Sequence, residues 1–141
     1  MSFDKVRLHR MSNSLEKKFK FIQIDEVLAD NIKKIEFINI TDNYKKNGIG
    51  FCCVHNNEII GVASSNIFYK DGIEVNIKVK EEYRRKGIAT AMASKLIIEC
   101  LNRNKKISWD AANLNSVSLA EKLGFEYDSS YNIYNFKESK K

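Results

Sequence analysis

One stretch of this chain constrains its fold more than any other. Residues 73–80 alternate like a strand, residues 84–86 are three consecutive cations, and residue 87 is a glycine. An apolar stripe of helical period follows over about residues 87–103. A strand, a basic turn and an amphipathic helix, in that order, predict a layered α/β domain in which the helix packs on a sheet.

The start of this helix is a predicted anion site. The first N–H groups of a helix lack partners and carry the positive end of its dipole. Arg84, Arg85 and Lys86 precede them, and Gly87 lets a ligand approach the backbone. The pattern favours a pyrophosphate, although the G-x-G-x-x-G and P-loop motifs are both missing. The alternative without function is a charged turn between a strand and a helix.

Two motifs give the chain a family resemblance. Arg84-x-x-Gly87-x-Ala89, with Val79 five positions before Arg84, resembles the coenzyme A signature of the GNAT acetyltransferases. The segment from Asn113 to Phe125 resembles the family's C-terminal N-x-x-A-x-x-L-Y-x-K-x-G-F motif. Residues 50–54, 109–113 and 119–125 look like the zwittermicin A resistance-type branch, whose members are often longer. The chain resembles their C-terminal part.

The remaining pattern predicts the other elements. Strands are expected at 18–24, 49–55, 58–68, 73–80, 105–109, 125–128 and 131–136, with turns at Asn56-Asn57 and Lys70-Asp71-Gly72. Helices are expected at 26–36, capped by Asp25, and at 87–103 and 115–123, with a short helix or turn at 41–47. This order predicts the fold class α/β (α+β), a mixed, mostly antiparallel, twisted sheet with flanking helices. It matches the GNAT acyl-CoA N-acyltransferase fold that the resemblance implies.

Size and composition predict a single domain over residues 1–141, with residues 1–15 and 138–141 loose. The chain has 141 residues, of which 43% are hydrophobic and 30% charged. No apolar run approaches the ~20 residues that span a bilayer, and Met1–Arg7 have no signal-peptide core. Three cysteines without metal-ligand spacing predict neither a disulfide framework nor a metal site. Cys52 and Cys53 are neighbours, and on a strand they would point to opposite faces. We therefore expect a cytoplasmic protein without a membrane partner.

The net charge of +6 has two interpretations. A lysine-rich surface keeps a protein soluble, whereas a cluster of cations attracts an anion. No nucleic-acid motif or basic platform with interleaved aromatic residues is present, so no nucleic-acid partner is predicted. Coenzyme A accounts for the cluster at 84–86 more economically.

The resemblance implies roles for particular residues. The backbone N–H groups of residues 85–90 would bind the phosphates. The edge of the strand at Ile77 and Val79 would bind the pantetheine arm, and the Val79 N–H would stabilise the oxyanion of acetyl transfer. Asn113 and Ser116 match family positions near the arm, and Asn113 is equally a turn or cap residue. The complete implied set for acetyl-CoA is Ile77, Val79, Arg84, Arg85, Lys86, Gly87, Ile88, Ala89, Thr90, Asn113 and Ser116.

The proton-transfer groups are less constrained by the sequence. Glu74 is the candidate base, directly or through a water, and its alternative is a solvent-facing strand carboxylate. Asp110 is a second candidate carboxylate, and His55 reads as a surface residue near a turn. Ala120 stands where many family members carry a tyrosine acid, so we assign no acid; Tyr127, Tyr131 or water remain open.

The sequence therefore predicts an acetyl-CoA-dependent N-acetyltransferase that transfers acetyl directly to a primary amine of a small molecule. A covalent acyl-cysteine route lacks a Cys–His arrangement in the sequence. One alternative is a protein or peptide amine as acceptor. The other is a non-catalytic coenzyme A sensor. A homodimer is possible on the same resemblance.

Overall fold

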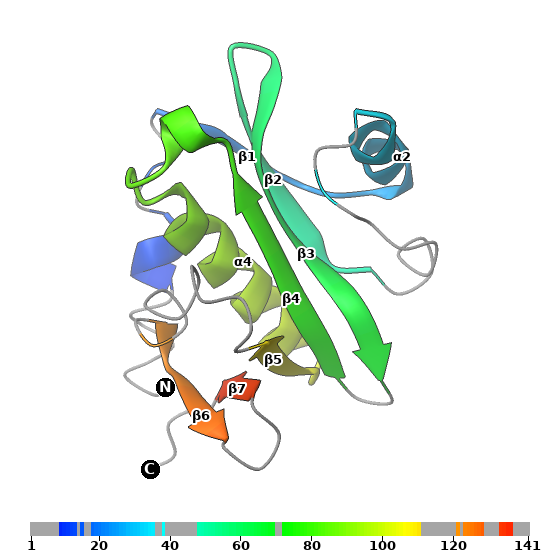
Figure 1. The fold of residues 1–141 in the computed structure, drawn as a ribbon, viewed down its shortest axis with the longest axis vertical. Coiled ribbons are helices and arrows are strands. Elements are labelled where there is room, and N and C mark those ends of the chain that lie inside the picture. Colours follow the sequence, from blue (N-terminus) through cyan, green and yellow to red (C-terminus); the bar gives the residue numbers. More distant parts are fainter. Residues whose placement is uncertain are drawn as a thin grey trace.

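The structure is a computed structural model, and its strands form one sheet with helices on both faces (Figure 1). It describes residues 9–13, 15, 18–35, 38, 48–69, 72–110, 121, 123–128 and 133–136. The strands are β1 (Lys20–Gln23), β2 (Gly50–His55), β3 (Glu58–Tyr69), β4 (Gly72–Val79), β5 (Lys106–Asp110), β6 (Phe125–Asp128) and β7 (Ile133–Phe136). The helices are α2 (Glu26–Lys34), the 3-10 turn η1 (Glu81–Tyr83) and α4 (Ile88–Asn102).

The seven strands lie in the order β1-β2-β3-β4-β5-β7-β6. β4 and β5 are parallel, and the other neighbours are antiparallel. The β2–β3 hairpin closes through Asn56 and Asn57, with φ of 52° and 62°. Two left-handed residues in a two-residue loop match the right-handed twist of the strands. The predicted mixed, mostly antiparallel sheet and its Asn-Asn turn are confirmed.

The two faces of the sheet bury different clusters. α4 packs against β2, β3, β4 and β5 over a core that includes Cys53 and Ala63. The other face carries α2, whose Ala29 and Ile32 pack with Cys52 and Val62. Successive strand residues point to opposite faces, which separates Cys52 from Cys53 as the sequence predicts.

Local signals explain where α2 begins. The Asp25 carboxylate accepts a hydrogen bond of 2.8 Å from the Leu28 N–H, so Asp25 is the N-cap that the sequence predicts. Lys33 and Lys34 lie in the last turn, where cations interact favourably with the helix dipole. Among the described residues, no helix is both long enough and apolar enough to cross a bilayer.

The expectation for the N-terminal residues needs correction. Residues 1–15 were expected to be loose, yet residues 9–12 form a helical turn, and Met11 and Leu15 pack against the core beside α4. The backbone carbonyl of Leu15 accepts hydrogen bonds from the N–H groups of Lys18 and Phe19. The short apolar pattern hid this packing, because its partners are distant in sequence. The predicted elements at 41–47 and 115–120 lie outside the described residues, as do Lys70 and Asp71 of the predicted turn.

β4 has a neighbour on both sides only along its first half. Its pairing with β5 covers Gly72, Ile73 and Glu74, whereas its pairing with β3 continues to Val79. β5 itself continues through Asp110 by pairing with β7. Beyond Glu74 the edge of β4 that faces β5 has no strand partner among the described residues, so β4 and β5 part there.

α4 approaches β3 at Gly61, where the strand has no side chain. A Cβ at Gly61 would lie 2.9 Å from Met92 Cε and 3.4 Å from Ile88 Cγ2. Gly61 pairs with Val79 at the end of β4. Close packing at this position therefore sets how near the first turns of α4 lie to that end of the strand.

We expect Gly61→Ala to lower the free energy of unfolding by about 1–3 kcal/mol, because Met92 must leave its position to admit the new methyl group. In a Met92→Ala background the same substitution should cost clearly less, since the clashing atoms are gone. Urea unfolding of the wild type, the two single variants and the double variant measures both costs. Equal costs in the two backgrounds would contradict the assignment to this contact.

Candidate active site

The chain between β4 and α4 forms an uncapped helix entrance. Gly87 is the N-cap of α4, with φ of 85°, and no described side chain caps the first turn. The first helical hydrogen bond runs from the Ala91 N–H to the Gly87 carbonyl. The N–H groups of Ile88, Ala89 and Thr90 therefore have no partner within the helix. This is the arrangement that the sequence predicts for an anion site.

Backbone strain in the preceding turn supports this assignment. Arg85 has a φ of 65°, which costs a non-glycine residue about 1–2 kcal/mol. Strain of this kind persists where the surroundings require it, often at a binding site. Left-handed residues turn successive N–H groups toward one side, the geometry of an anion-binding nest.

Contacts on three sides hold this turn in place. Arg84 Nε donates a 3.1 Å hydrogen bond to the Val79 carbonyl, which ties the turn to the end of β4. The Tyr83 ring lies 6.4 Å from the Phe19 ring and 5.9 Å from the His55 ring, centroid to centroid. Lys80 Nζ lies 2.8 Å from Glu58 Oε2, and this hydrogen bond raises the pKa of Lys80. The turn is thus fixed to both β4 and the β2–β3 hairpin.

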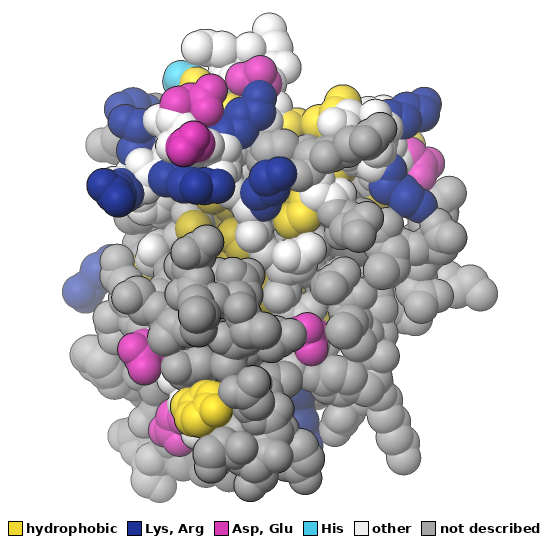
Figure 2. Space-filling model, in the orientation of Figure 1, with side chains coloured by type: hydrophobic (Ala, Val, Ile, Leu, Met, Phe, Trp, Pro, Cys, Tyr) yellow, Lys and Arg dark blue, Asp and Glu magenta, His cyan; other side chains and the backbone are white. Residues whose placement is uncertain are grey.

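The surface around this entrance is strongly basic. Arg84, Arg85 and Lys86 are exposed, with Glu81 and Glu82 exposed beside them. Figure 2 shows Lys and Arg side chains gathered at the end of the molecule where β4 runs into α4. Thr90 is half-buried, and the Ile88 side chain is buried in the core, so Ile88 offers only its N–H group.

The open edge of β4 presents the backbone of two predicted residues. The Lys80 N–H donates to the Ile60 carbonyl at 2.8 Å, so Ile60 and Lys80 form a hydrogen-bonded pair. Hydrogen-bonded and non-hydrogen-bonded pairs alternate along an antiparallel ladder. The pairs Gly61–Val79 and Ala63–Ile77 are therefore of the second kind, so the backbone N–H and C=O groups of Val79 and Ile77 make no hydrogen bond to β3. These groups point instead to the other edge of β4, where β5 has diverged. The Val79 carbonyl is already bonded to Arg84, whereas the two N–H groups have no described partner.

Glu74 lies at the point where β4 and β5 part. It forms the last β4–β5 pair, with Ser108. Ile73 and Val75 point into the core under α4, so the Glu74 side chain, which is half-buried, lies on the opposite face. Glu74 is five residues from Val79, about 16 Å along a strand. The two predicted catalytic groups are therefore too far apart to contact one carbon atom directly.

Several other predicted residues are placed differently or not described. His55 is part of the aromatic contact with Phe19 and Tyr83 and is only half-buried. Tyr127, on β6, is 50% exposed. Asn113, Ser116, Ala120 and Tyr131 lie outside the described residues, and so does the side chain of Asp110.

The thiols do not provide a nucleophile. Burial raises the pKa of Cys52 to about 11 and the pKa of Cys53 and Cys100 to about 12. A thiol with such a pKa stays protonated at neutral pH, and the thiolate is the reactive form. Within the described ranges, no group of three or more His, Cys, Asp or Glu side chains is arranged to hold a metal ion.

One polar side chain that the sequence analysis overlooked lies nearby. Ser64 is fully buried on β3, and none of the described residues hydrogen bonds to its hydroxyl group. The signal available in the sequence was a Ser-Ser pair within an otherwise apolar strand.

Comparison with known proteins identifies the family. The family model described as GNAT acetyltransferase matches residues 1–134. The chain belongs to this family. It is 33% identical over 101 residues to the uncharacterized N-acetyltransferase YdfB of Bacillus subtilis, a match that covers 70% of this chain and 39% of YdfB.

Solved structures agree with the GNAT fold. A GCN5-related N-acetyltransferase-like protein from Streptococcus suis superimposes with a TM-score of 0.82 at 33% identity, covering 95% of this chain and 55% of that one. A GNAT acetyltransferase from Elizabethkingia anophelis with acetyl-CoA bound superimposes with a TM-score of 0.57 at 22% identity, covering 79% and 78% of the two chains. The chain thus spans about half or less of the length of its two more similar relatives. The zwittermicin A resistance-type branch stays a prediction.

We expect Gly87→Ala to weaken acetyl-CoA binding by about tenfold or more, the equivalent of about 1.4 kcal/mol. The methyl group would stand where the ligand approaches the backbone, while the one described atom within 4 Å of it would be Leu15 Cδ1, 3.7 Å away. Isothermal titration calorimetry measures the affinity.

Asn104→Ala is the matched control for this variant. Asn104 has a φ of 57° just beyond the other end of α4, so alanine is strained there as well. It should leave the affinity unchanged. Unaltered acetyl-CoA affinity in Gly87→Ala would exclude this helix entrance as the phosphate site.

Proposed function

We propose that this GNAT domain is an acetyl-CoA-dependent N-acetyltransferase that transfers acetyl directly to a primary amine of a small molecule. The observation that carries the proposal is the continuity of two features. The edge of β4 opens after Glu74, and the same strand leads through a fixed turn to the uncapped N-terminus of α4. A linear ligand with phosphates at one end and an amide-containing arm fits such a surface.

The residues at the helix entrance have the chemistry to hold coenzyme A. Free N–H groups on residues 88–90, a left-handed glycine and exposed cations suit a pyrophosphate. On this proposal the phosphates lie against the N–H groups of residues 85–90, and the arm lies along Ile77 and Val79. Asn113 and Ser116 remain predicted contacts from the family resemblance. The bound thioester supplies the acetyl group; the protein supplies position and charge stabilisation.

Distance along β4 refines the assignment of the oxyanion donor. Val79 is joined to the phosphate turn through Arg84, so it lies at the phosphate end of the open edge. The arm of coenzyme A contains about four peptide-length units, or about 14 Å when extended, so the thioester lies several strand residues from the phosphates, which are beyond Val79. We therefore place the Val79 N–H against the arm and give the Ile77 N–H the better position for the carbonyl oxygen of the thioester.

The distance along β4 also decides how Glu74 can act as the base. Glu74 is three residues from Ile77, about 10 Å along the strand, and its side chain lies on the face away from α4. We propose that Glu74 accepts the acceptor's proton through a water molecule rather than directly. No acid is assigned, because a thiolate is a fair leaving group without one. The cysteines show no disulfide pattern, so we propose that the protein lies in the reducing cytoplasm. A homodimer stays a prediction.

The experiment that tests the function is turnover of acetyl-CoA with a panel of amines. Thiol release that depends on a small primary amine, with the acetylated amine identified by mass spectrometry, is the expected result. Turnover only with peptides would move the acceptor to the protein class. Tight acetyl-CoA binding without turnover on any amine or peptide would replace the enzyme with a coenzyme A sensor.

We expect Ile77→Pro to lower kcat by about 100-fold or more relative to Ile77→Ala, because proline removes a donor aimed at the oxyanion. The Ile77 N–H faces the open edge, so proline breaks no ladder bond there. Ile77→Ala is the matched control, since it loses the side chain and keeps the N–H.

Steady-state kinetics of Ile77→Pro, Ile77→Ala and Val79→Pro separate the two candidate donors. Val79→Pro should mainly raise the KM for acetyl-CoA. A larger loss of kcat in Val79→Pro than in Ile77→Pro would return the oxyanion role to Val79.

A further inference from the structure

The chain segment that leads into β1 meets the phosphate turn, residues 84–87, near both of its ends. A Cβ placed at Gly87, the last residue of this turn, would lie 3.7 Å from Leu15 Cδ1. At Tyr83, directly before the turn, the ring lies 6.4 Å from the Phe19 ring at an interplanar angle of 85°. An edge-to-face arrangement of this kind is a favoured geometry for aromatic rings. Leu15 and Phe19 therefore lie against opposite ends of one short turn.

Leu15 and Phe19 are themselves held as one unit. The Leu15 carbonyl accepts hydrogen bonds from the N–H groups of Lys18 and Phe19, at 3.1 and 3.0 Å. Both side chains pack in the core cluster that includes α4, and Phe19 is only 4% exposed. The Phe19 ring also lies 5.0 Å from the His55 ring. A displacement of either residue is thus resisted by the contacts of the other, so the pair can brace the phosphate turn.

The phosphate turn has a conformation that its own sequence does not favour. Arg85 has a φ of 65°, in the left-handed region that is costly for a residue with a Cβ. The turn begins at Arg84, which is bonded to the Val79 carbonyl, and leads into Ile88, whose side chain is buried. Three residues between two fixed points leave the backbone little freedom. If either end moves, Arg85 can return to the right-handed region and its N–H group turns away from the anion site.

We propose that Leu15 and Phe19 are positioning residues for coenzyme A, which keep the phosphate turn in its binding conformation before the ligand arrives. This role rests on the proposed function and deepens it, because it assigns part of the affinity for acetyl-CoA to a segment outside the β4–α4 connection. When only a fraction of the molecules has the binding conformation, the apparent Kd rises by the inverse of that fraction. Leu15 and Phe19 act through the backbone of the turn.

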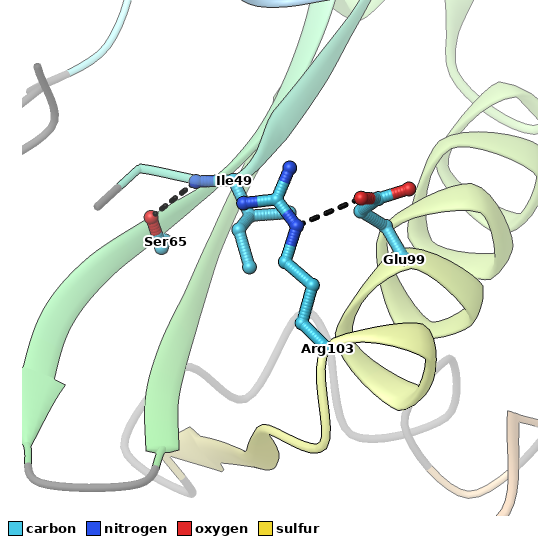
Figure 3. Close-up of polar contacts among 4 residues, drawn as sticks. All are labelled: Ile49, Ser65, Glu99 and Arg103. Carbon is cyan, nitrogen blue, oxygen red and sulfur yellow. Dashed lines mark hydrogen bonds and ion pairs between the residues drawn. The ribbon is translucent and has the colours of Figure 1, made fainter. Parts of the chain in front are cut away.

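The first test compares Leu15→Ala with Leu101→Ala. Both leucines are half-buried and pack against the same core cluster. Leu101 lies in the last turn of α4, where Arg103 Nε is 2.8 Å from Glu99 Oε2 (Figure 3). In calorimetric titrations, Leu15→Ala should raise the Kd for acetyl-CoA by about fivefold or more, and Leu101→Ala by less than about twofold. Equal changes in Kd would overturn the proposal.

A second pair of variants tests Phe19. Phe19→Leu keeps an apolar side chain and removes the ring that meets Tyr83, so it should raise the Kd for acetyl-CoA as Leu15→Ala does. Phe21→Leu is the matched control, because Phe21 is a half-buried phenylalanine on β1 whose ring lies 5.3 Å from Lys95 Nζ on α4. Melting temperatures of the four variants show how much stability each has lost. A Kd that follows the melting temperature rather than the contact with the turn would refute the role.

The conformation of Arg85 gives a test that a merely structural role would not pass. Arg85→Ala and Arg85→Asn both remove the cation, but asparagine tolerates a positive φ better than alanine. With Leu15 intact, the brace holds the turn and the two Kd values for acetyl-CoA should agree within about twofold. In a Leu15→Ala background, Arg85→Ala should bind about threefold or more weakly than Arg85→Asn, because the preference of the residue itself then sets the population. The same ratio in both backgrounds would mean that Leu15 contacts the ligand directly or only supports the fold, and would overturn the proposal.

Steady-state kinetics with the best amine of the panel separate this role from the proposed function. Leu15→Ala should raise the KM for acetyl-CoA and leave kcat within about twofold, because the turn has its binding conformation once the ligand is bound. A clear fall in kcat at saturating acetyl-CoA would overturn the role. A wild-type protein that binds acetyl-CoA and acetylates no amine refutes the proposed function alone, and the titrations still decide the role of Leu15 and Phe19. A wild-type protein without affinity for acetyl-CoA refutes both.

Discussion

The parting of β4 from β5 after Glu74 is the constraint on which the candidate site depends. A strand inside a sheet has its N–H and C=O groups bonded on both sides. Among the described residues, the second half of β4 has a strand partner only in β3. The unpaired edge groups of Ile77 and Val79 become a template for a ligand that carries amides. β5 continues beyond this point because β7 pairs with it on its other side. One divergence thus creates the binding edge without unravelling the sheet.

The fixed junction between β4 and α4 makes that edge useful. An open strand edge alone would bind many extended chains, and an uncapped helix alone would bind many anions. Arg84 joins the two by bonding the Val79 carbonyl, and close packing at Gly61 sets how near α4 lies to the end of β4. On the proposed function, selectivity for a ligand with both phosphates and an amide arm would follow from this fixed spacing rather than from either feature alone.

Local signals were readable from the sequence, and long-range ones were not. The cap at Asp25, the Asn56-Asn57 turn and the opposite faces of Cys52 and Cys53 depend on neighbouring residues, so pattern alone predicted them. Leu15 packs near Gly87, and Arg84 bonds to Val79, through contacts that no period in the sequence encodes. The motif at Arg84, Gly87 and Ala89 marked the helix entrance, whereas the side chain that acts on the acceptor depends on the tertiary arrangement of β3 and β4.

The contrast between Ser64 and Ser65 shows how stability separates two residues that look identical in sequence. Both lie on one strand, one residue apart, with no solvent contact. Ser65 satisfies a buried backbone N–H at the start of β2, and its presence is explained by folding alone. Ser64 has no such explanation, because none of the described residues bonds to its hydroxyl, and a buried hydroxyl without a partner lowers the stability of the fold.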